Sequence, residues 1–313
     1  MTGFTGDRVS GSSGIALGFL SELEHWTAMD RSASAAALRA SLLVWLRDAQ
    51  AAQPTMALVH QFASRALSVA DAAVARGDSP LDARQNLTAS CAAEREDLAT
   101  ANAAAAKLAT GLVTQQDAWI ATLSASALVT ATLAELQSRG RRPRVLIAES
   151  RPNLEGRAQA AALAALGIPV WIVADVALPM LLQQAACVLI GADAITENGV
   201  INKIGSYSTA LAAREHGVPV WAVGIRRKLL PGDTPALAIE EMPPAELWDA
   251  PPDGVRPRNV YFELVPSALL RGVVVEDGVL GANELRIAAA DRELPAELAA
   301  ALQPRQGART RMV

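Results

Sequence analysis

Residues 191–228 read GADAITENGVINKIGSYSTALAAREHGVPVWAVGIRRK, and they directly follow the apolar run CVLI at residues 187–190. A short apolar run of this kind, closed by a glycine, is typical of a buried β-strand. The segment 206–216 predicts a helix, and PVWAVG at 219–224 predicts the next strand. The stretch therefore predicts one strand–helix–strand unit of a parallel sheet, with Asp193 just beyond the end of a strand.

The same alternation runs through the C-terminal half of the chain. Continuous apolar strands separated by helices are typical of a parallel sheet covered on both faces, so we expect a Rossmann-like α/β domain. The dinucleotide fingerprint GxGxxG is absent, which argues against an NAD-dependent dehydrogenase. The predicted strands are 145–150, 169–174, 187–192, 219–224, 260–264 and 273–277, and the predicted helices between them lie near 156–166, 177–186 and 206–216.

The N-terminal half has a different pattern, with apolar residues recurring every three or four positions from residue 15 to about 138. Segments such as LRASLLVWLRDA and LVHQFASRALSVADAAV predict amphipathic helices, and we expect no strand before the linker at 138–144. Breaks are predicted at 53–54, 76–82 and 111–116. The expected organisation is an all-α domain at 1–138, a Rossmann-like α/β domain at 139–302 and a flexible tail at 303–313.

Composition excludes several classes of partner. The formal charge of -4 provides no broad basic surface, so we expect no nucleic-acid partner. The most apolar stretch, residues 161–192, is interrupted by Pro169, Asp175 and Pro179, so we expect no membrane span and no membrane partner. The N-terminus MTGFTGDRVSGSSG lacks the apolar core of a signal peptide.

Cysteine and histidine usage gives no sign of a metal site. Cys91 and Cys187 form neither a disulfide framework nor a metal-ligand spacing, and the three histidines have no partner at ligand spacing. We therefore expect a cytoplasmic protein without a metal or other cofactor.

Polar clusters follow three of the predicted strands. Ligands of open α/β sheets bind beyond the carboxyl ends of the strands, so convergence of these clusters predicts a site. Each cluster alone is equally compatible with an ordinary charged loop. The clusters are Glu149, Arg151 and Arg157 after the first strand, Asp193 after the third, and Arg226, Arg227 and Lys228 after the fourth.

Asp193 is the candidate acid of this site. A carboxyl group behind a buried strand is desolvated, which favours its neutral form and suits it to acid–base chemistry. The Asn202–Lys203 pair leads into a predicted helix that opens at Gly205 and Ser206, and the exposed N–H groups of a helix start can hold a phosphate. The alternative is a structural role in which Asp193 caps the turn.

The segment 230–259 is rich in proline and acidic residues and precedes a predicted strand. A loop of this length inside a compact domain is usually functional, so we expect it to contribute either to the site or to an assembly surface.

The motifs GADAITENGVINKIGSYSTALAAREHGVPVWAV, ESRPNLEGR and VYFELVPSALLRGVVVEDG carry a family resemblance. The N-terminal DRVSGSSGIALGFL and the central WIATLSAS belong to the same resemblance. Over nearly its whole length, the chain resembles a family that unites three groups of proteins. These are the α, β and δ subunits of translation initiation factor 2B, methylthioribose-1-phosphate isomerase and ribose-1,5-bisphosphate isomerase. Lys228, in RRKLLP, matches the initiation-factor and ribose-bisphosphate branches.

The resemblance implies a function and a set of site residues. Its isomerases convert a phosphorylated aldose to a ketose with a cysteine and an aspartate, and they hold phosphate with arginines, an Asn-Lys pair and a late lysine. The resemblance also implies a homodimer or a higher homo-oligomer. By motif, the catalytic positions are Asp193 and Ser124, and the phosphate-binding positions are Asn202, Lys203, Lys228, Arg151, Arg157, Ser126 and Gly11.

The chain departs from the family pattern in the half of the pocket that the helical domain supplies. Ser124 stands in the place of the cysteine, and a serine hydroxyl cannot act as a thiolate without a neighbouring base. Ser10 and Gln53 replace arginines, and Glu155 replaces a neutral amide. Two lost arginine–phosphate contacts favour a ligand with one phosphate, or a nucleotide, over a bisphosphate.

Two functions therefore stay open. One is an isomerase of a phosphorylated sugar, similar to ribose-1,5-bisphosphate isomerase but with an altered site. The other is a non-catalytic subunit that senses a sugar phosphate or nucleotide or serves assembly, as the initiation-factor branch implies. In both, the partner is a small phosphorylated metabolite.

Overall fold

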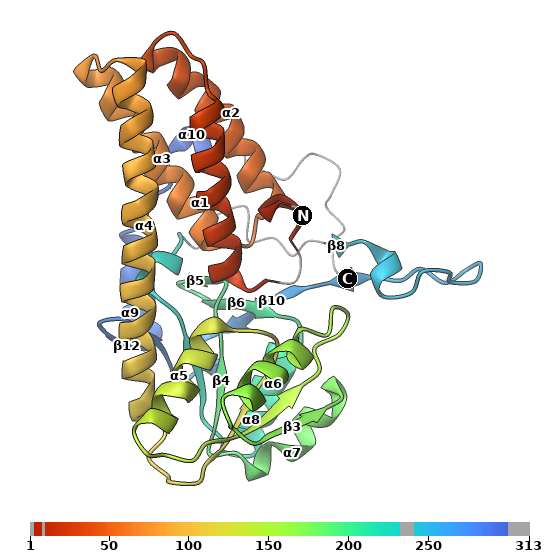
Figure 1. Cartoon of the computed structure of the whole chain (residues 1–313). Helices are drawn as coiled ribbons and strands as arrows, with labels where there is room; N and C mark the ends of the chain where they lie inside the picture. The colour runs from red at the N-terminus through yellow and green to blue at the C-terminus, as the bar shows by residue number, and fades with distance from the viewer. Residues whose placement is uncertain (1–2, 8–9, 232–240, 300–313) are drawn as a thin grey trace.

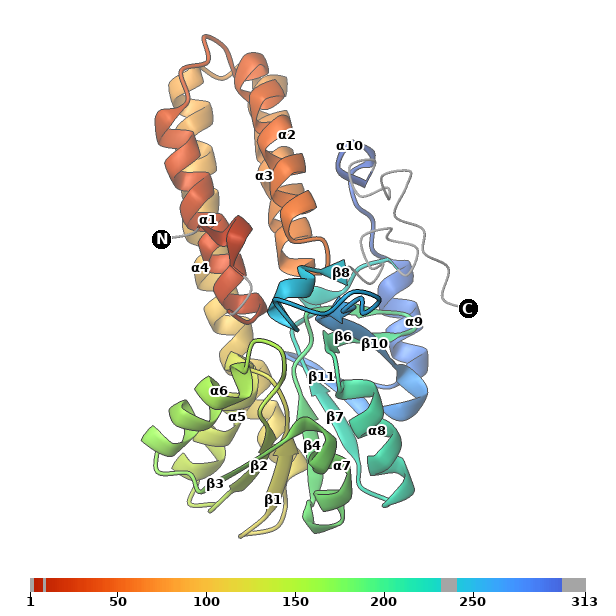
Figure 2. The same ribbon diagram turned by 90° about the vertical axis from the view of Figure 1, so that its right-hand side faces the viewer.

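The computed structural model describes residues 3–7, 10–231 and 241–299. Four long helices form an upper layer, and an α/β layer lies below it (Figures 1 and 2). This arrangement confirms the predicted α/β class with a helical N-terminal part. The predicted tail at 303–313 lies outside the described residues.

The upper layer consists of antiparallel helices joined by short turns. Ser34 and Ser79 cap two of them, because each hydroxyl accepts a hydrogen bond from the backbone N–H three residues later. Gly77, at φ 71°, ends a third in the left-handed conformation that favours glycine. The helices are α1 Ser12–Met29, α2 Ala35–Ala52, α3 Ala57–Arg76 and α4 Pro80–Ala109.

The lower layer is built on a seven-stranded sheet in the order β12-β11-β7-β4-β1-β2-β3. All neighbouring strands are parallel except the edge pair β11–β12. The predicted strands near 145, 169, 187, 219 and 273 are confirmed as members of this sheet. The strands are β1 Trp119–Thr122, β2 Arg144–Ala148, β3 Val170–Val173, β4 Cys187–Ile190, β7 Val220–Val223, β11 Gly272–Val275 and β12 Gly278–Leu280.

Strand β1 corrects the sequence interpretation. It lies at the centre of the sheet, between β2 and β4, and it is followed by helix α5 Ala127–Ser138. The expectation of no strand before residue 138 is therefore wrong, and the sheet starts inside the segment assigned to the helical half. A four-residue apolar strand between alanine-rich helices carries no periodicity that separates it from them.

A second, three-stranded sheet stands beside the first. Its order is β10-β6-β5, with β5 Ala194–Thr196, β6 Gly199–Lys203 and β10 Phe262–Pro266 paired antiparallel. The sequence had suggested a turn at Asn202 and Lys203, whereas the structure places both at the end of β6. Asn202 pairs in register with Glu263, and Lys203 pairs with Phe262.

Helices cover both faces of the large sheet. Helices α4, α5 and α6 Glu155–Ala165 lie together on one face, whereas α7 Leu178–Leu181 and α8 Ser206–Glu215 contact the other. Successive side chains of each strand point to opposite faces of the sheet. Ile147 therefore lies in the core shared with the four long helices, and Leu146 lies in the core under α7 and α8. Helix α9 Ala282–Ala290 packs near β5 and β12, and α10 Ala296–Ala299 contacts α2 and α3.

The insertion at 230–259 is described in part. Strand β8 Glu241–Met242 pairs with β9 Asn259–Val260, and between them an arm projects from the body of the molecule (Figure 1). Residues 232–240 lie outside the described part. Within the described residues, no helix combines the length and apolar character needed to cross a membrane.

Helix α6 approaches the end of β2 closely at Gly156, and a substitution there tests this contact. A Cβ atom at this position would lie 1.9 Å from the carbonyl oxygen of Ala148, whereas a Cβ at Gly111 would meet nothing within 4 Å. We expect Gly156→Ala to lower the free energy of unfolding by about 1–3 kcal/mol or more, since the helix must shift. Gly111→Ala is the control, and we expect a change within about 0.5 kcal/mol. Urea denaturation of both variants checks this, and equal changes would contradict it.

Candidate functional site

A pocket lies where the helical layer meets the sheets. Its walls come from the start of α1, the turn between α2 and α3, the loop before α5, the start of α6 and the loops after β4 and β7. The structure brings most of the predicted site residues to this one place. They are Gly11, Ser124, Ser126, Asp193, Asn202, Lys203 and Lys228.

Asp193 is held rigidly at the pocket wall. Its N–H donates to the carbonyl of Ile201 at 2.8 Å, and its own carbonyl accepts from the N–H of Ala57 at 3.1 Å. Asp193 as a whole residue is half-buried. Burial raises the pKa of Asp193 to about 6, although the ammonium groups of Lys228 and Lys203 pull the pKa down. The side chain therefore changes its protonation state close to neutral pH.

Lys228 and Ser12 complete the surroundings of Asp193. The Lys228 ammonium is buried and donates to Ser12 Oγ at 2.7 Å and to the carbonyl of Ala192 at 2.6 Å. Burial lowers the pKa of Lys228 to about 8, and Asp193 opposes this shift. The Ser12 hydroxyl is in turn hydrogen-bonded to Asp193. A chain of contacts thus links a sheet-domain lysine, a serine of the helical layer and the candidate acid.

Sequence interpretation missed Ser12. The signal was present, because the run SGSSG directly precedes an apolar helical segment, and serines at such positions begin helices. Ser12 is the first residue of α1, and its side chain acts across the boundary between the two layers.

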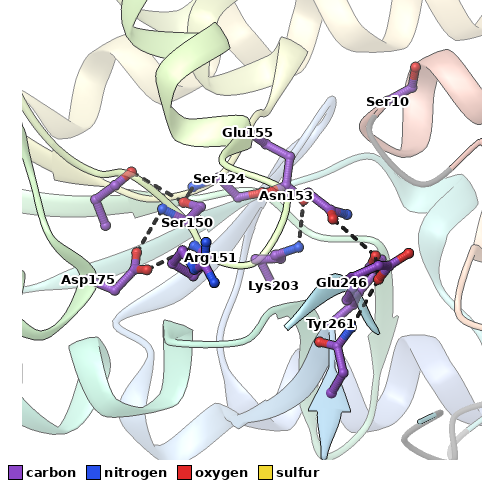
Figure 3. Close-up of polar contacts among 12 residues, drawn as sticks. Ser10, Ser124, Ser150, Arg151, Asn153, Glu155, Asp175, Lys203, Glu246 and Tyr261 are labelled. Atoms are coloured by element: carbon purple, nitrogen blue, oxygen red, sulfur yellow. Dashed lines mark hydrogen bonds and ion pairs between the residues drawn. The ribbon is translucent and has the colours of Figure 1, made fainter. Parts of the chain in front are cut away.

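Lys203 is paired with another pocket residue. Its Nζ lies 2.5 Å from Glu155 Oε1, both side chains are buried, and the ammonium lies 4.2 Å from the centroid of the Tyr261 ring (Figure 3). The second carboxylate oxygen, Glu155 Oε2, is buried and has no hydrogen-bond partner among the described residues. Glu155, which stands where the family pattern has a neutral amide, thus places a carboxylate directly on the lysine that was expected to hold phosphate.

Asn202 supports the turn that follows β6. Its Nδ2 donates to Ser206 Oγ at 2.8 Å, and Ser206 Oγ donates to the carbonyl of Lys203 at 2.6 Å. Asn202 is therefore fixed in place while part of it still lines the pocket.

The prediction that the start of α8 binds the phosphate is wrong. The Glu263 carboxylate already accepts hydrogen bonds there, with the N–H of Tyr207 at 2.9 Å and with the N–H groups of Gly205 and Ser206. Burial raises the pKa of Glu263, and these N–H groups lower it. The helix start thus holds an anion of the protein itself, supplied by a strand distant in sequence.

Two other helices direct their first turns to the pocket. The start of α1 contributes Gly11, Ser12 and Ser13, and the start of α5 contributes Ser126, Ala127 and Leu128. The two starts are close, because a Cβ atom at Gly11 would lie 2.9 Å from the carbonyl oxygen of Ala125. No side chain caps the first turn of α1 among the described residues, and Ser12 and Ser13 of this turn line the pocket.

Arg151 and Arg157 are not brought to this pocket. Arg157 forms an exposed ion pair with Glu149 at 2.7 Å. The backbone N–H of Arg151 donates to Asp175 Oδ2 at 2.8 Å (Figure 3). Neither arginine is among the residues that line the pocket.

The cluster after β7 contributes only its lysine. Arg226 pairs with Asp277, Arg227 pairs with Glu94, and only Lys228 lines the pocket. The three residues form one 3₁₀ turn, in which successive side chains point about 120° apart, so they cannot converge on one ligand.

Ser124 lines the pocket in an unusual backbone conformation. Its φ is 61°, and its N–H donates to Ser150 Oγ at 2.7 Å. Among the described residues, no carboxylate or imidazole is hydrogen-bonded to the Ser124 hydroxyl. The geometry therefore provides no base that would activate this serine.

Ser12→Ala tests the link between the layers. Removing a donor to a carboxylate disfavours the charged form, so we expect the pKa of Asp193 to rise from about 6 by about one unit. Carboxyl ¹³C NMR titration of the free protein measures this shift. Ser13→Ala, one residue further along the same helix, is the control and should leave the titration unchanged. An unaltered pKa in Ser12→Ala would refute the link.

Comparisons with known proteins show which family the chain resembles. The sequence profile described as the Initiation factor 2 subunit family matches residues 8–282. The chain is 36% identical over 160 residues to a methylthioribose-1-phosphate isomerase of Syntrophotalea carbinolica, covering 47% of this chain and 46% of the relative. It is 40% identical over 148 residues to the same enzyme of Oleidesulfovibrio alaskensis, covering 44% and 41%. The matches span less than half the length of these relatives. The relatives come from the methylthioribose branch, whereas Lys228 resembles the initiation-factor and ribose-bisphosphate branches.

Solved structures show the same fold. A translation initiation factor eIF-2B of Pyrococcus horikoshii OT3 superposes with a TM-score of 0.74 at 23% identity, covering 88% of this chain and 94% of that one. The tetrameric eIF2B-beta2-delta2 complex of C. thermophilum gives a TM-score of 0.69 at 20% identity, covering 92% and 91%. Identities this low establish the fold alone. Because the family profile extends over most of the sequence, the chain belongs to the initiation factor 2 subunit family.

Proposed function

We propose that the chain binds a small sugar phosphate in this pocket and that Asp193 transfers a proton in an aldose–ketose isomerisation. The observation that carries the proposal is the Asp193 carboxylate in the pocket wall, with a pKa of about 6 and with Lys228 and Lys203 close enough to shift that pKa. A carboxylate that titrates near neutral pH is suited to accept and return a proton. The similarity to methylthioribose-1-phosphate isomerases supports this reaction class.

The phosphate would lie between the starts of α1 and α5. Uncapped N–H groups at Ser12 and Ser13 and the dipoles of both helices favour an anion there. The Lys228 ammonium, hydrogen-bonded to Ser12, adds a positive charge at the same end of the pocket. Ser126 and Asn202, which also line the pocket, would then contact the sugar.

Proton transfer would use a single carboxylate. The carboxylate of Asp193 takes the proton from C2 of the aldose, and the resulting acid returns a proton to C1. The proton of the C2 hydroxyl moves to the carbonyl oxygen at C1, so that the C2 oxygen becomes the new ketone. Ser124 would position the substrate, because no described base is hydrogen-bonded to its hydroxyl.

The same absence of a base beside Ser124 favours a second candidate function. A subunit that binds the sugar phosphate without turning it over needs the phosphate seat and Lys228, but no second proton-handling group. Self-association would accompany either function, and the tetrameric assembly of the related C. thermophilum subunits supports it.

Solvent-exchange measurements test the isomerase. In deuterated water, a panel of phosphorylated pentoses should yield ketose that carries deuterium at C1. Asp193→Asn should lower the rate at least about 100-fold, because the base is removed. Asp277→Asn, which alters an exposed carboxylate paired with Arg226, is the control and should retain activity. Binding without exchange or product would reject the isomerase in favour of the second candidate, and absence of binding would reject both.

The rate should depend on pH in a bell-shaped manner. Asp193 must be ionised to act as the base, so activity should rise with pH through about 6. Lys228 must keep its proton to attract the phosphate, so activity should fall through about 8. Initial rates between pH 5 and 9.5 measure both limbs. A profile without an acidic limb would exclude Asp193 as the base.

A further inference from the structure

The pocket has a second end, formed by Glu155, Lys203 and Tyr261. Lys203 lies 2.5 Å from Glu155 Oε1 and stacks on the Tyr261 ring at 4.2 Å. The Tyr261 hydroxyl lies 3.1 Å from Asn153 Oδ1 and also contacts the Glu246 carboxylate, so the hydroxyl end of the ring is fixed in place (Figure 3). The ammonium of Lys203 is therefore neutralised and covered within the protein.

The charge of the pocket lining does not favour a second anion. The described lining residues carry three carboxyl groups, on Asp7, Glu155 and Asp193, and two ammonium groups, on Lys203 and Lys228. Lys203 is bound to Glu155, and Lys228 lies beside the helix starts. A phosphate at the Lys203 end would have to displace a buried carboxylate from its partner, or lie against it.

One acceptor at this end is unsatisfied. Glu155 Oε2 is buried without a hydrogen-bond partner among the described residues, and Glu155 lines the pocket. A buried acceptor without a donor is costly, and native proteins almost always satisfy such atoms. A hydroxyl group of a ligand would supply the missing donor, whereas a phosphate dianion has none to offer.

We infer that Glu155 determines specificity: it neutralises Lys203 with one oxygen, accepts a hydrogen bond from a ligand hydroxyl with the other, and restricts the pocket to sugars with a single phosphate. The inference rests on the proposed sugar-phosphate function and names its substrate class. A bisphosphate would place its second phosphate against the Glu155 carboxylate. Glu155 is here a binding residue and takes no part in proton transfer.

Glu155→Gln tests the inference, because it keeps the size of the side chain and removes its charge. Isothermal titration calorimetry at pH 7 compares ribose 5-phosphate with ribose 1,5-bisphosphate as ligands. The unaltered protein should bind the monophosphate more tightly. Glu155→Gln should improve the relative affinity for the bisphosphate at least about tenfold, since Lys203 is released to the second phosphate. Glu135→Gln, which alters an exposed glutamate paired with Arg139, is the matched control and should leave the ratio unchanged.

A double variant keeps the test decisive if Glu155→Gln does not fold. Glu155→Gln combined with Lys203→Met removes both buried charges together, which a folded core tolerates better than one unpaired charge. Compared with the unaltered protein it should still relax the preference for the monophosphate, but by less than about tenfold, because repulsion is lost while no cation is gained.

The outcomes separate the inference from the function on which it rests. If the unaltered protein binds neither sugar phosphate, the proposed function falls and the inference falls with it. If the unaltered protein binds the monophosphate but neither variant changes the ratio of affinities, the function stands and the role of Glu155 is overturned. A bisphosphate that binds the unaltered protein more tightly than the monophosphate would also overturn it.

Discussion

The burial of the Lys228 ammonium is the constraint on which the site depends. Removing an ammonium group from water is tolerated only when hydrogen bonds and opposite charge replace the lost hydration. Here the replacements come from three separate parts of the chain, namely the hydroxyl of Ser12, the carbonyl of Ala192 and the charge of Asp193. The helical layer and the sheet domain must therefore meet at this point for the lysine to be satisfied, and the pocket is the space left beside that junction.

Much of the fold could be predicted because it rests on local patterns. Apolar strands, amphipathic helices and the breaks between them follow from periodicity and turn residues, and Asp193 and Lys228 follow from their places behind strands. Strand β1 escaped because four residues give too little pattern. The anion seat at α8 was wrong because Glu263, 57 residues beyond Ser206 in the numbering, reaches that helix start through strand pairing. Contacts of this kind depend on tertiary structure, and no local sequence pattern predicts them.

The arginines also show that local sequence patterns do not predict tertiary contacts. Arg157, Arg226 and Arg227 were grouped with the site because they follow strands, but each has a carboxylate neighbour that directs it elsewhere. Conversely, the sequence showed Glu155 only as a carboxylate in place of a neutral amide, and the structure gives it a partner in Lys203. Which ionic groups pair is decided by distances across the fold, whereas the sequence shows only which groups exist.

Helix α4 has a mechanical consequence for how a metabolite can reach the pocket. It is 30 residues long, or about 45 Å at 1.5 Å per residue, and it runs unbroken from the upper hairpins down to β7 and β11. A continuous rod shared by both layers resists hinge opening between them, since bending it would break backbone hydrogen bonds. Opening the pocket would then involve the shorter segments of its wall, such as those that carry Met242 and Tyr261, and not a separation of the two layers.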